Sequence, residues 1–248
     1  MNRRELIAST LLACPTYALL GLFDAKAADS RLDAQRWMRR QDEIARALSR
    51  GEIAPAQWQT EVESLAASID PAQVMAETKQ AVLRKAGRGG DNDPVRHNVY
   101  FHDEHGALRK LAFATALFVF DAENVITPHA HRNMVSAHMV VKGEFRVRNF
   151  DRVRDEQGAA VIRPTRDGVA RLGEVSTMSA ARDNVHWFVP RTAHATTLDV
   201  IVDGLGNAKP RYVIEPVDPV RGQTLPDGTI RAPYLTFAES TRFYTREV

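Results

Sequence analysis

Four histidines in strand-like surroundings are the residues of this sequence best suited to chemistry: His129, His131, His138 and His186. Successive side chains of a β-strand point to opposite faces, so residues two apart share a face. His129 and His131 therefore present two imidazoles side by side, and Ser136 shares one face of the next predicted strand with His138. Such spacing is what a metal site on a sheet requires.

A third imidazole can complete the site, because a closed barrel would bring His186 to the cavity that His129 and His131 face. Three neutral imidazoles can occupy one face of a divalent iron and leave the opposite positions for substrate and oxygen; zinc, nickel, copper or manganese would also accept them. Two simpler interpretations stay open, namely a surface-exposed His129–His131 pair and a core His138 bonded to a carbonyl group. The other histidines are expected on the surface or in turns: His97, His102, His105 and His194.

Other kinds of catalytic motif are missing from the sequence. It contains no G-x-S-x-G, no phosphate-binding glycine loop and no H-E-x-x-H. Glu123, Glu144 and Asp199 are candidate carboxylates, but no pair of them has the spacing of acid/base partners. The only cysteine, Cys14, lies in the N-terminal segment, so any metal of the mature chain must be held by histidines and carboxylates.

The composition is that of an ordinary globular protein. The 248 residues are 44% hydrophobic and 26% charged, with 14 Gly and 12 Pro, which excludes collagen-like, low-complexity and disulfide-framework proteins. Lys and Arg number 33 against 31 Asp and Glu, a formal charge of +2. Because no excess of positive charge is available to hold phosphates, we expect no nucleic-acid partner.

The sequence pattern over residues 94–248 predicts a compact all-β domain, whose strands must position the histidines. Short apolar or alternating runs are separated by turn signals at Lys142-Gly143, Arg166-Asp167-Gly168 and Asp203-Gly204. The fold class predicted is mainly β, a jelly-roll barrel with an N-terminal helical segment. The predicted strands cover residues 98–101, 108–120, 125–127, 135–141, 144–150, 175–178, 185–189, 196–202 and 211–214, with turns and one more strand expected after residue 218.

Residues 28–93 are predicted to be a helical segment and linker. Apolar residues recur at near-helical spacing, and Asp70-Pro71 is typical of an N-cap followed by proline in the first turn. Two or three amphipathic helices follow from this pattern. The breaker-rich run 88–94 then forms a linker to the β domain.

Residues 1–27 are predicted to be an export signal. Arg3-Arg4 precedes an apolar stretch, and Ala25-Lys26-Ala27 offers a cleavage site, which is typical of the twin-arginine type. Cleavage predicts a periplasmic or secreted protein with no stable membrane span. A permanent anchor and lipidation at Cys14 are the alternatives; Pro15 and the polar residues interrupt the apolar span.

The two histidine segments resemble the cupin superfamily. Pro128-His129-Ala130-His131 followed by Val140-Val141-Lys142-Gly143 is similar to the first cupin motif, and Asp183-Asn184-Val185-His186-Trp187 is similar to the second. Ser136 stands where the family usually has glutamate. Histidines without that glutamate resemble the thiol dioxygenases of the cysteamine dioxygenase and plant cysteine oxidase group, whose pattern is matched by His129, His131, Met134, Gly143, Phe150-Asp151, His186 and Leu198-Asp199-Val200.

This resemblance covers residues 120–215 and implies a fold, a metal and a reaction. It implies an Fe(II) centre held by His129, His131 and His186, with a thiolate and dioxygen at the open positions. Asp199 is implied to act near the substrate. His138 is an addition to the family pattern and is either a fourth ligand or a hydrogen-bond partner of the site.

The leading hypothesis is therefore an exported mononuclear non-haem iron dioxygenase that uses a small thiol and dioxygen, with Asp199 and His138 as catalytic residues. Arg132 and Arg182 are considered as carboxylate-binding residues for the substrate. One rival is another metal-dependent cupin enzyme with a four-histidine site that includes His138. A second rival is a non-catalytic ligand-binding cupin whose helices dock a partner. The sequence does not reveal the oligomeric state.

Overall fold

A computed structural model describes residues 33–80, 84–85, 93–103, 105–121, 123–207 and 209–245. These residues belong to one compact unit, Arg31–Val248. The predicted export signal lies outside the described residues, as does most of the predicted linker. No helix within the described ranges combines the length and apolar character needed to cross a membrane.

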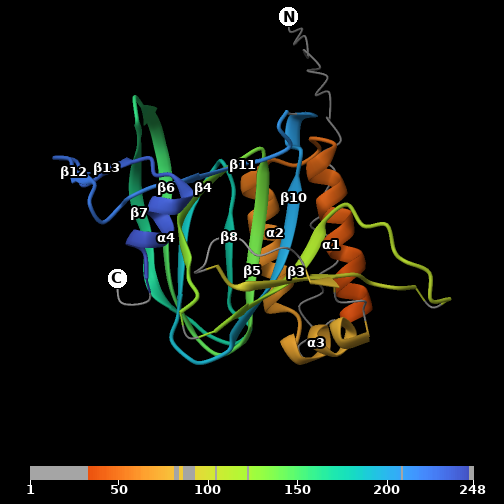
Figure 1. Cartoon of the computed structure of the whole chain (residues 1–248). Helices are drawn as coiled ribbons and strands as arrows, with labels where there is room; N and C mark the ends of the chain where they lie inside the picture. Colours follow the sequence, from red (N-terminus) through yellow and green to blue (C-terminus); the bar gives the residue numbers. More distant parts are fainter. Residues whose placement is uncertain are drawn as a thin grey trace, which may run out of the picture. The chain divides into compact units, whose positions relative to one another are not determined.

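Helices come first, strands follow, and a short helix ends the described chain (Figure 1). The N-terminal helices are α1 (Ala34–Ser49), α2 (Pro55–Ala67) and α3 (Pro71–Gln80). The strands are β1 (Arg84–Lys85), β2 (Val95–Val99), β3 (Ala114–Phe120), β4 (Ile126–Arg132), β5 (Met134–Lys142), β6 (Phe145–Glu156), β7 (Ala159–Ala170), β8 (Val175–Met178), β9 (Val185–Pro190), β10 (Ala195–Asp203), β11 (Val213–Pro216), β12 (Gln223–Thr224) and β13 (Ile230–Pro233). A 3-10 turn, η1 (Leu205–Asn207), follows β10, and α4 (Phe237–Phe243) follows β13.

Two antiparallel sheets form the barrel. The six-stranded sheet has the order β1-β2-β3-β10-β5-β8, and the seven-stranded sheet has the order β11-β4-β9-β6-β7-β13-β12. In both sheets some strands far apart in the chain are neighbours, such as β3 with β10 and β4 with β9, as the nested Greek keys of a jelly roll require. The predicted fold class, a jelly-roll barrel with an N-terminal helical segment, is confirmed.

Capping side chains mark the starts of two N-terminal helices, and the second of these starts, Asp70-Pro71, was predicted from the sequence. The Asp33 side chain accepts a hydrogen bond from the Arg36 backbone N–H at 2.7 Å and caps α1. Asp70 accepts one from the backbone N–H of Ala72 at 2.9 Å, with Pro71 in the first position of α3. These caps satisfy N–H groups that helical bonding leaves open.

The helices cover the outer face of the six-stranded sheet, as Figure 1 shows for α1 and α2. Strand β5 is buried over eight of its nine residues, because Ser136 and His138 face the barrel interior while Ala137 and Met139 face the helices. One apolar cluster joins Trp58 of α2 and its helical neighbours to these outward residues of β5 and β10. The helical segment therefore shields from solvent the outer face of the sheet that contains His138.

Replacing Trp58 with Ala is expected to destabilise the fold by about 3–5 kcal/mol. The Trp58 side chain is fully buried in the cluster between the helices and the sheet, so its loss leaves a large cavity. Denaturant unfolding measures the change, and Gln57→Ala on the exposed face of α2 serves as the matched control. A Trp58→Ala protein as stable as the control would show that the helical layer contributes no packing energy.

The turn predicted at Arg166-Asp167-Gly168 is wrong. All three residues lie within β7, which pairs with β6 along its full length. The chain reverses instead at Gln157-Gly158, where Gly158 has a positive φ of 73°. Of the predicted run 108–120, only Ala114–Phe120 forms a strand of a sheet, and the end of the described chain contains two short strands and α4.

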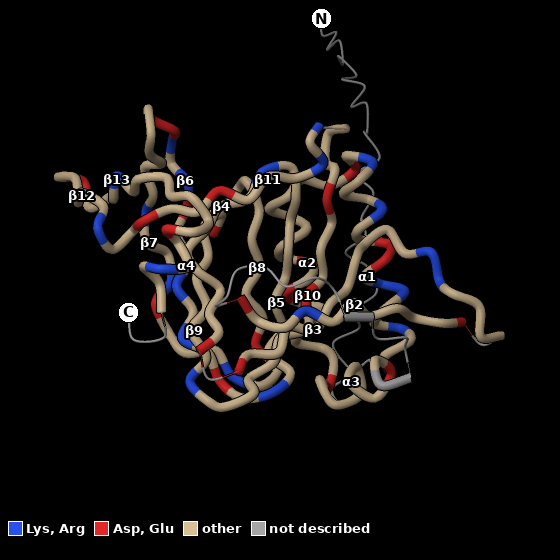
Figure 2. The backbone as a smooth tube through the Cα atoms, viewed as in Figure 1, with Lys and Arg blue, Asp and Glu red and all other residues tan. Residues whose placement is uncertain are grey.

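Charges of both signs are interspersed along the described chain, with no extended stretch of Lys and Arg alone (Figure 2). Many pair across strands, such as Arg146 with Asp167 at 2.8 Å and Arg132 with Glu215 at 2.7 Å. This distribution agrees with the near-zero net charge of +2.

Candidate metal centre

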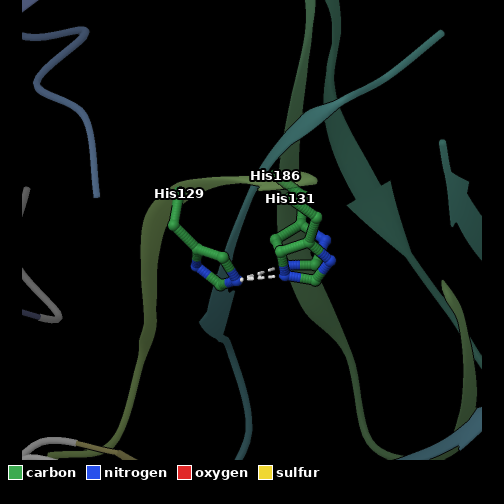
Figure 3. Close-up of side chains that lie close together, drawn as sticks. All are labelled: His129, His131 and His186. Carbon is green, nitrogen blue, oxygen red and sulfur yellow. Dashed lines mark hydrogen bonds between the residues drawn. The ribbon is translucent and has the colours of Figure 1, made fainter. Parts of the chain in front are cut away.

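Three histidines from two neighbouring strands converge at one point in the barrel. His129 and His131 share a face of β4, and His186 of β9 is the direct cross-strand partner of His129. The Nε2 atom of His129 lies 2.8 Å from Nε2 of His131 and 3.0 Å from Nε2 of His186. Figure 3 shows His129 facing the other two rings. The sequence prediction that these distant imidazoles meet is confirmed.

All three imidazoles are neutral at physiological pH. Burial lowers the pKa of His129 to about 4, and burial lowers the pKa values of His131 and His186 well below the ordinary 6.5. The carbonyl oxygen of Thr127 lies 2.8 Å from Nδ1 of His129, and a proton held there leaves the Nε2 lone pair of this ring free. Three neutral imidazoles whose Nε2 atoms meet in this way are a ligand set for a cation.

The donor set fits a divalent transition-metal ion. One nitrogen from each of the three histidines lies within 4.8 Å of the others, and this is the sole cluster of its kind in the part of the chain that the structure describes. No carboxylate joins the group. Imidazole ligands suit iron, zinc, copper and nickel, whereas calcium and magnesium prefer oxygen. His131 and His186 are buried, so an ion held there would be shielded from bulk water on one side.

His138 lies beside the three histidines rather than among them. Its ring centroid is 4.7 Å from that of His186, but both of its nitrogens face other groups. Nε2 is 3.0 Å from the hydroxyl of Ser136, and Nδ1 is 2.7 Å from Oδ2 of Asp199. This geometry favours a supporting partner over a fourth ligand.

Asp199 is the most deeply buried carboxylate at the site. It stands opposite His138 in the pairing of β10 with β5, and its exposed fraction is 1%. Apart from the close approach to His138, neither carboxylate oxygen has an aligned hydrogen bond within the described ranges. A buried carboxylate without such bonds is costly, so its position points to a role in the chemistry of the cavity.

A cavity of about 700 Å³ opens onto these residues. The three histidines, His138 and Asp199 line it on one side, together with Met134 and Ser136. Helix α4 lies at the cavity, where Ser240 donates a hydrogen bond to Thr127 Oγ1 at 2.8 Å. A cavity of this size accommodates a small-molecule ligand.

The two arginines considered for substrate binding lie elsewhere. Arg132 is bound to Glu215 and Asp155, and Arg182 is bound to Glu63, and neither lines the cavity of the histidines. The arginine on the cavity wall is Arg96 of β2, which the sequence prediction missed because it placed that strand at residues 98–101. If the predicted strand had been extended back by two residues from Asn98, the alternation of side chains would have placed Arg96 on the same face of the strand as Asn98.

The chain matches no protein-family model and no curated protein sequence. Its structure is similar to KdgF from Halomonas sp., with 15% identity, a TM-score of 0.33 and coverage of 50% of this chain and 86% of that chain. It is also similar to an uncharacterised double-stranded β-helix protein from Klebsiella pneumoniae, with 14% identity, a TM-score of 0.34 and coverage of 55% and 87%. An oxalate oxidase shares 17% identity, a TM-score of 0.34 and coverage of 48% and 55%.

Metal retention is expected to extend to lower pH than ordinary histidines would allow. An ordinary imidazole takes up a proton near pH 6.5, but the pKa of His129 is about 4 and those of its two partners are also depressed. Protons therefore compete for the lone pairs only toward pH 4, and the loaded protein should keep its metal at about pH 5. Metal analysis after dialysis at graded pH measures this, and a midpoint of metal loss near 6.5 would contradict it.

The same pKa shifts fix the sign of the pH dependence of stability. Between about pH 4 and 6.5 the unfolded chain binds more protons than the folded one, so the stability of the metal-free protein should rise with pH across this window.

Proposed function

We propose that this chain is an exported mononuclear non-haem iron dioxygenase that acts on a small thiol. The observation that carries the proposal is the convergence of three neutral imidazoles, without a carboxylate, at the wall of a cavity large enough for a small molecule. Three such ligands leave positions on an ion for substrate and oxygen. The motif resemblance around His129, His131 and His186 supports iron as the metal and a thiol as the substrate.

The overall reaction balances without an external reductant. A thiolate R–S⁻ and O2 give R–SO2⁻, in which both oxygen atoms are bonded to sulfur. Sulfur loses four electrons, and dioxygen accepts these four electrons. Iron held by His129, His131 and His186 would supply the electrons that activate dioxygen. The protein must hold the thiol as its thiolate and keep bulk water away from the reacting atoms.

The pair His138–Asp199 is proposed to remove the thiol proton. The carboxylate of Asp199 lies 2.7 Å from Nδ1 of His138, and the imidazole lies against His186, so a proton taken up at this pair stays next to the metal. A buried carboxylate stabilises the positive charge that the imidazole gains. Because Nδ1 faces Asp199, Nε2 is the nitrogen that would receive the proton, passed on by the Ser136 hydroxyl, which lies 3.0 Å from it and lines the cavity.

Oxygen consumption tests the reaction. The iron-loaded protein should consume one O2 per thiol with at least one of cysteamine, L-cysteine or 2-mercaptoethanol, and mass spectrometry should show a gain of two oxygen atoms. Zinc-loaded protein is the matched control, because zinc has no redox chemistry. An iron-containing protein that consumes no oxygen with any thiol would reject the substrate class.

Export is proposed on the sequence signals alone. Arg3-Arg4, the apolar stretch and Ala25-Lys26-Ala27 support cleavage before Ala28 and a periplasmic or secreted product. N-terminal sequencing of the protein from its own cells should find Ala28 as the first residue. A chain that keeps residues 1–27 in the cytoplasm would refute export without affecting the metal site.

A further inference from the structure

The register of the six-stranded sheet turns Arg96 toward the cavity. Asp199 of β10 is paired with Ala116 of β3, which is paired with Asn98 of β2, and paired residues share a face of the sheet. Arg96 is two residues before Asn98 and therefore faces the same side as Asp199. It lines the cavity of the three histidines.

Arg96 has no anionic partner among the described residues. Its half-buried guanidinium lies over the ring of Phe118, with Cζ 5.8 Å from the ring centroid, and its buried Nε has no hydrogen-bond partner. A guanidinium stays charged in proteins and carries five donors in a fixed fork. A partly buried cation with open donors is costly unless an anion from elsewhere occupies the space before it.

The acids on the cavity wall do not pair with Arg96. Asp203 is bonded to Arg211, with 3.0 Å between Nε and Oδ1, and Asp199 lies against His138. Asp93, which also lines the cavity, has an interaction of its own. The guanidinium of Arg96 is therefore the cationic group on the described wall of the cavity that has no anionic partner there. A carboxylate can bind a guanidinium through two parallel hydrogen bonds.

The rest of that wall is apolar and aromatic. Besides Arg96 and the histidines, the wall includes Phe118, Ile126, Ile201 and Ile214. Tyr212 and Phe237 also line it and remain 49% and 63% exposed. Exposed aromatic side chains at a cavity are suited to contact the apolar body of a ligand.

We propose that the cavity takes a small organic acid with an apolar body, whose carboxylate binds Arg96 while its other end reaches the three histidines. The proposal deepens the proposed function, because it makes the substrate a thiol that also carries a carboxylate. Arg96 then determines specificity for anionic over neutral or cationic substrates.

Binding of paired probes tests the proposal without any oxygen chemistry. The probes are phenylacetate against phenylacetamide and hexanoate against hexanamide, titrated calorimetrically into the zinc-loaded chain. Wild-type protein should bind at least one acid about 10- to 100-fold more tightly than its amide, as expected for a charge-assisted pair. Arg96→Met should reduce this preference to near unity, and Arg96→Lys should keep part of it. Arg163→Met on the exposed face of β7 is the matched control and should change nothing.

The outcomes separate this proposal from the dioxygenase reaction. Equal binding of acid and amide by wild-type protein would overturn it, as would a preference that survives in Arg96→Met, because the carboxylate would then bind elsewhere, for example at the metal. If the Arg96-dependent preference is found but the iron form consumes no oxygen with any thiol, the organic-acid site stands and the thiol reaction fails. Circular dichroism and melting temperature, compared across the variants, confirm that each one is folded.

Discussion

Replacing His186 with Ala is expected to abolish stoichiometric binding of a divalent metal. His186 supplies one of three nitrogens that lie within 4.8 Å of one another, and it is the cross-strand partner of His129. Only two imidazole ligands remain in this variant. The affinity for the metal should therefore fall by more than the 10- to 100-fold that is typical when a hydrogen-bond partner of a ligand is lost. Metal analysis after gel filtration measures the stoichiometry.

His138→Ala is the matched control for this loss. It removes another buried imidazole from the same cavity, but one whose nitrogens face Ser136 and Asp199. We expect this variant to retain one metal ion per chain with an affinity reduced by no more than about 100-fold. Loss of metal in His138→Ala, equal to that in His186→Ala, would instead favour a four-histidine site and another reaction type.

Asp199→Asn is expected to lower the rate of thiol oxidation by about 100- to 10,000-fold while metal content stays unchanged. The substitution keeps the shape of the side chain but removes the negative charge that lies 2.7 Å from Nδ1 of His138. The imidazole then loses the group that stabilises its protonated form, so the thiol proton has no acceptor. The rate of oxygen uptake by the iron-loaded variant measures the loss.

The pH profile separates this role from a merely structural one. A free thiol ionises near pH 8.5, so at higher pH the substrate arrives as thiolate and the acceptor is no longer needed. The deficit of Asp199→Asn should therefore shrink as pH rises through about 8.5. Asp167→Asn, an exposed carboxylate of β7, is the control variant. A deficit that is the same at every pH would contradict proton removal by the pair.

The three-histidine cluster was predictable from the sequence only in part by local spacing. His129 and His131 are two residues apart on one strand, so the period of a strand places them on one face. His186 was placed with them by the expected closure of the barrel and by the motif resemblance. The pairing of His138 with Asp199 was not readable, because it depends on the register between β5 and β10, more than fifty residues apart. Strand register follows from barrel packing and not from local composition.

The predicted turn at Arg166-Asp167-Gly168 failed for a physical reason. Asp and Gly favour turns only where no stronger pairing competes. Here Asp167 accepts two hydrogen bonds from Arg146 across the long hairpin of β6 and β7, and Gly168 sits opposite Val147. Cross-strand pairing outweighs the local turn preference at an exposed edge.

The apolar pattern of the helices indicated that they bury one face but not which surface they cover. The structure shows that β5 and β10 supply that surface through residues such as Met139 and Val200. These residues alternate along their strands with His138 and Asp199. Packing of Met139 and Val200 against the helices thus turns His138 and Asp199 toward the cavity.

X-ray absorption at the metal edge of the loaded full-length protein tests the central claim most directly. We expect one divalent metal ion per chain, with about three imidazole nitrogens at about 2.1 Å from it. The imidazole signal should weaken by one ligand in any residual metal bound to His186→Ala and stay unchanged in His138→Ala. A metal environment of oxygen ligands without imidazole, or a protein that binds no divalent ion, would contradict the account.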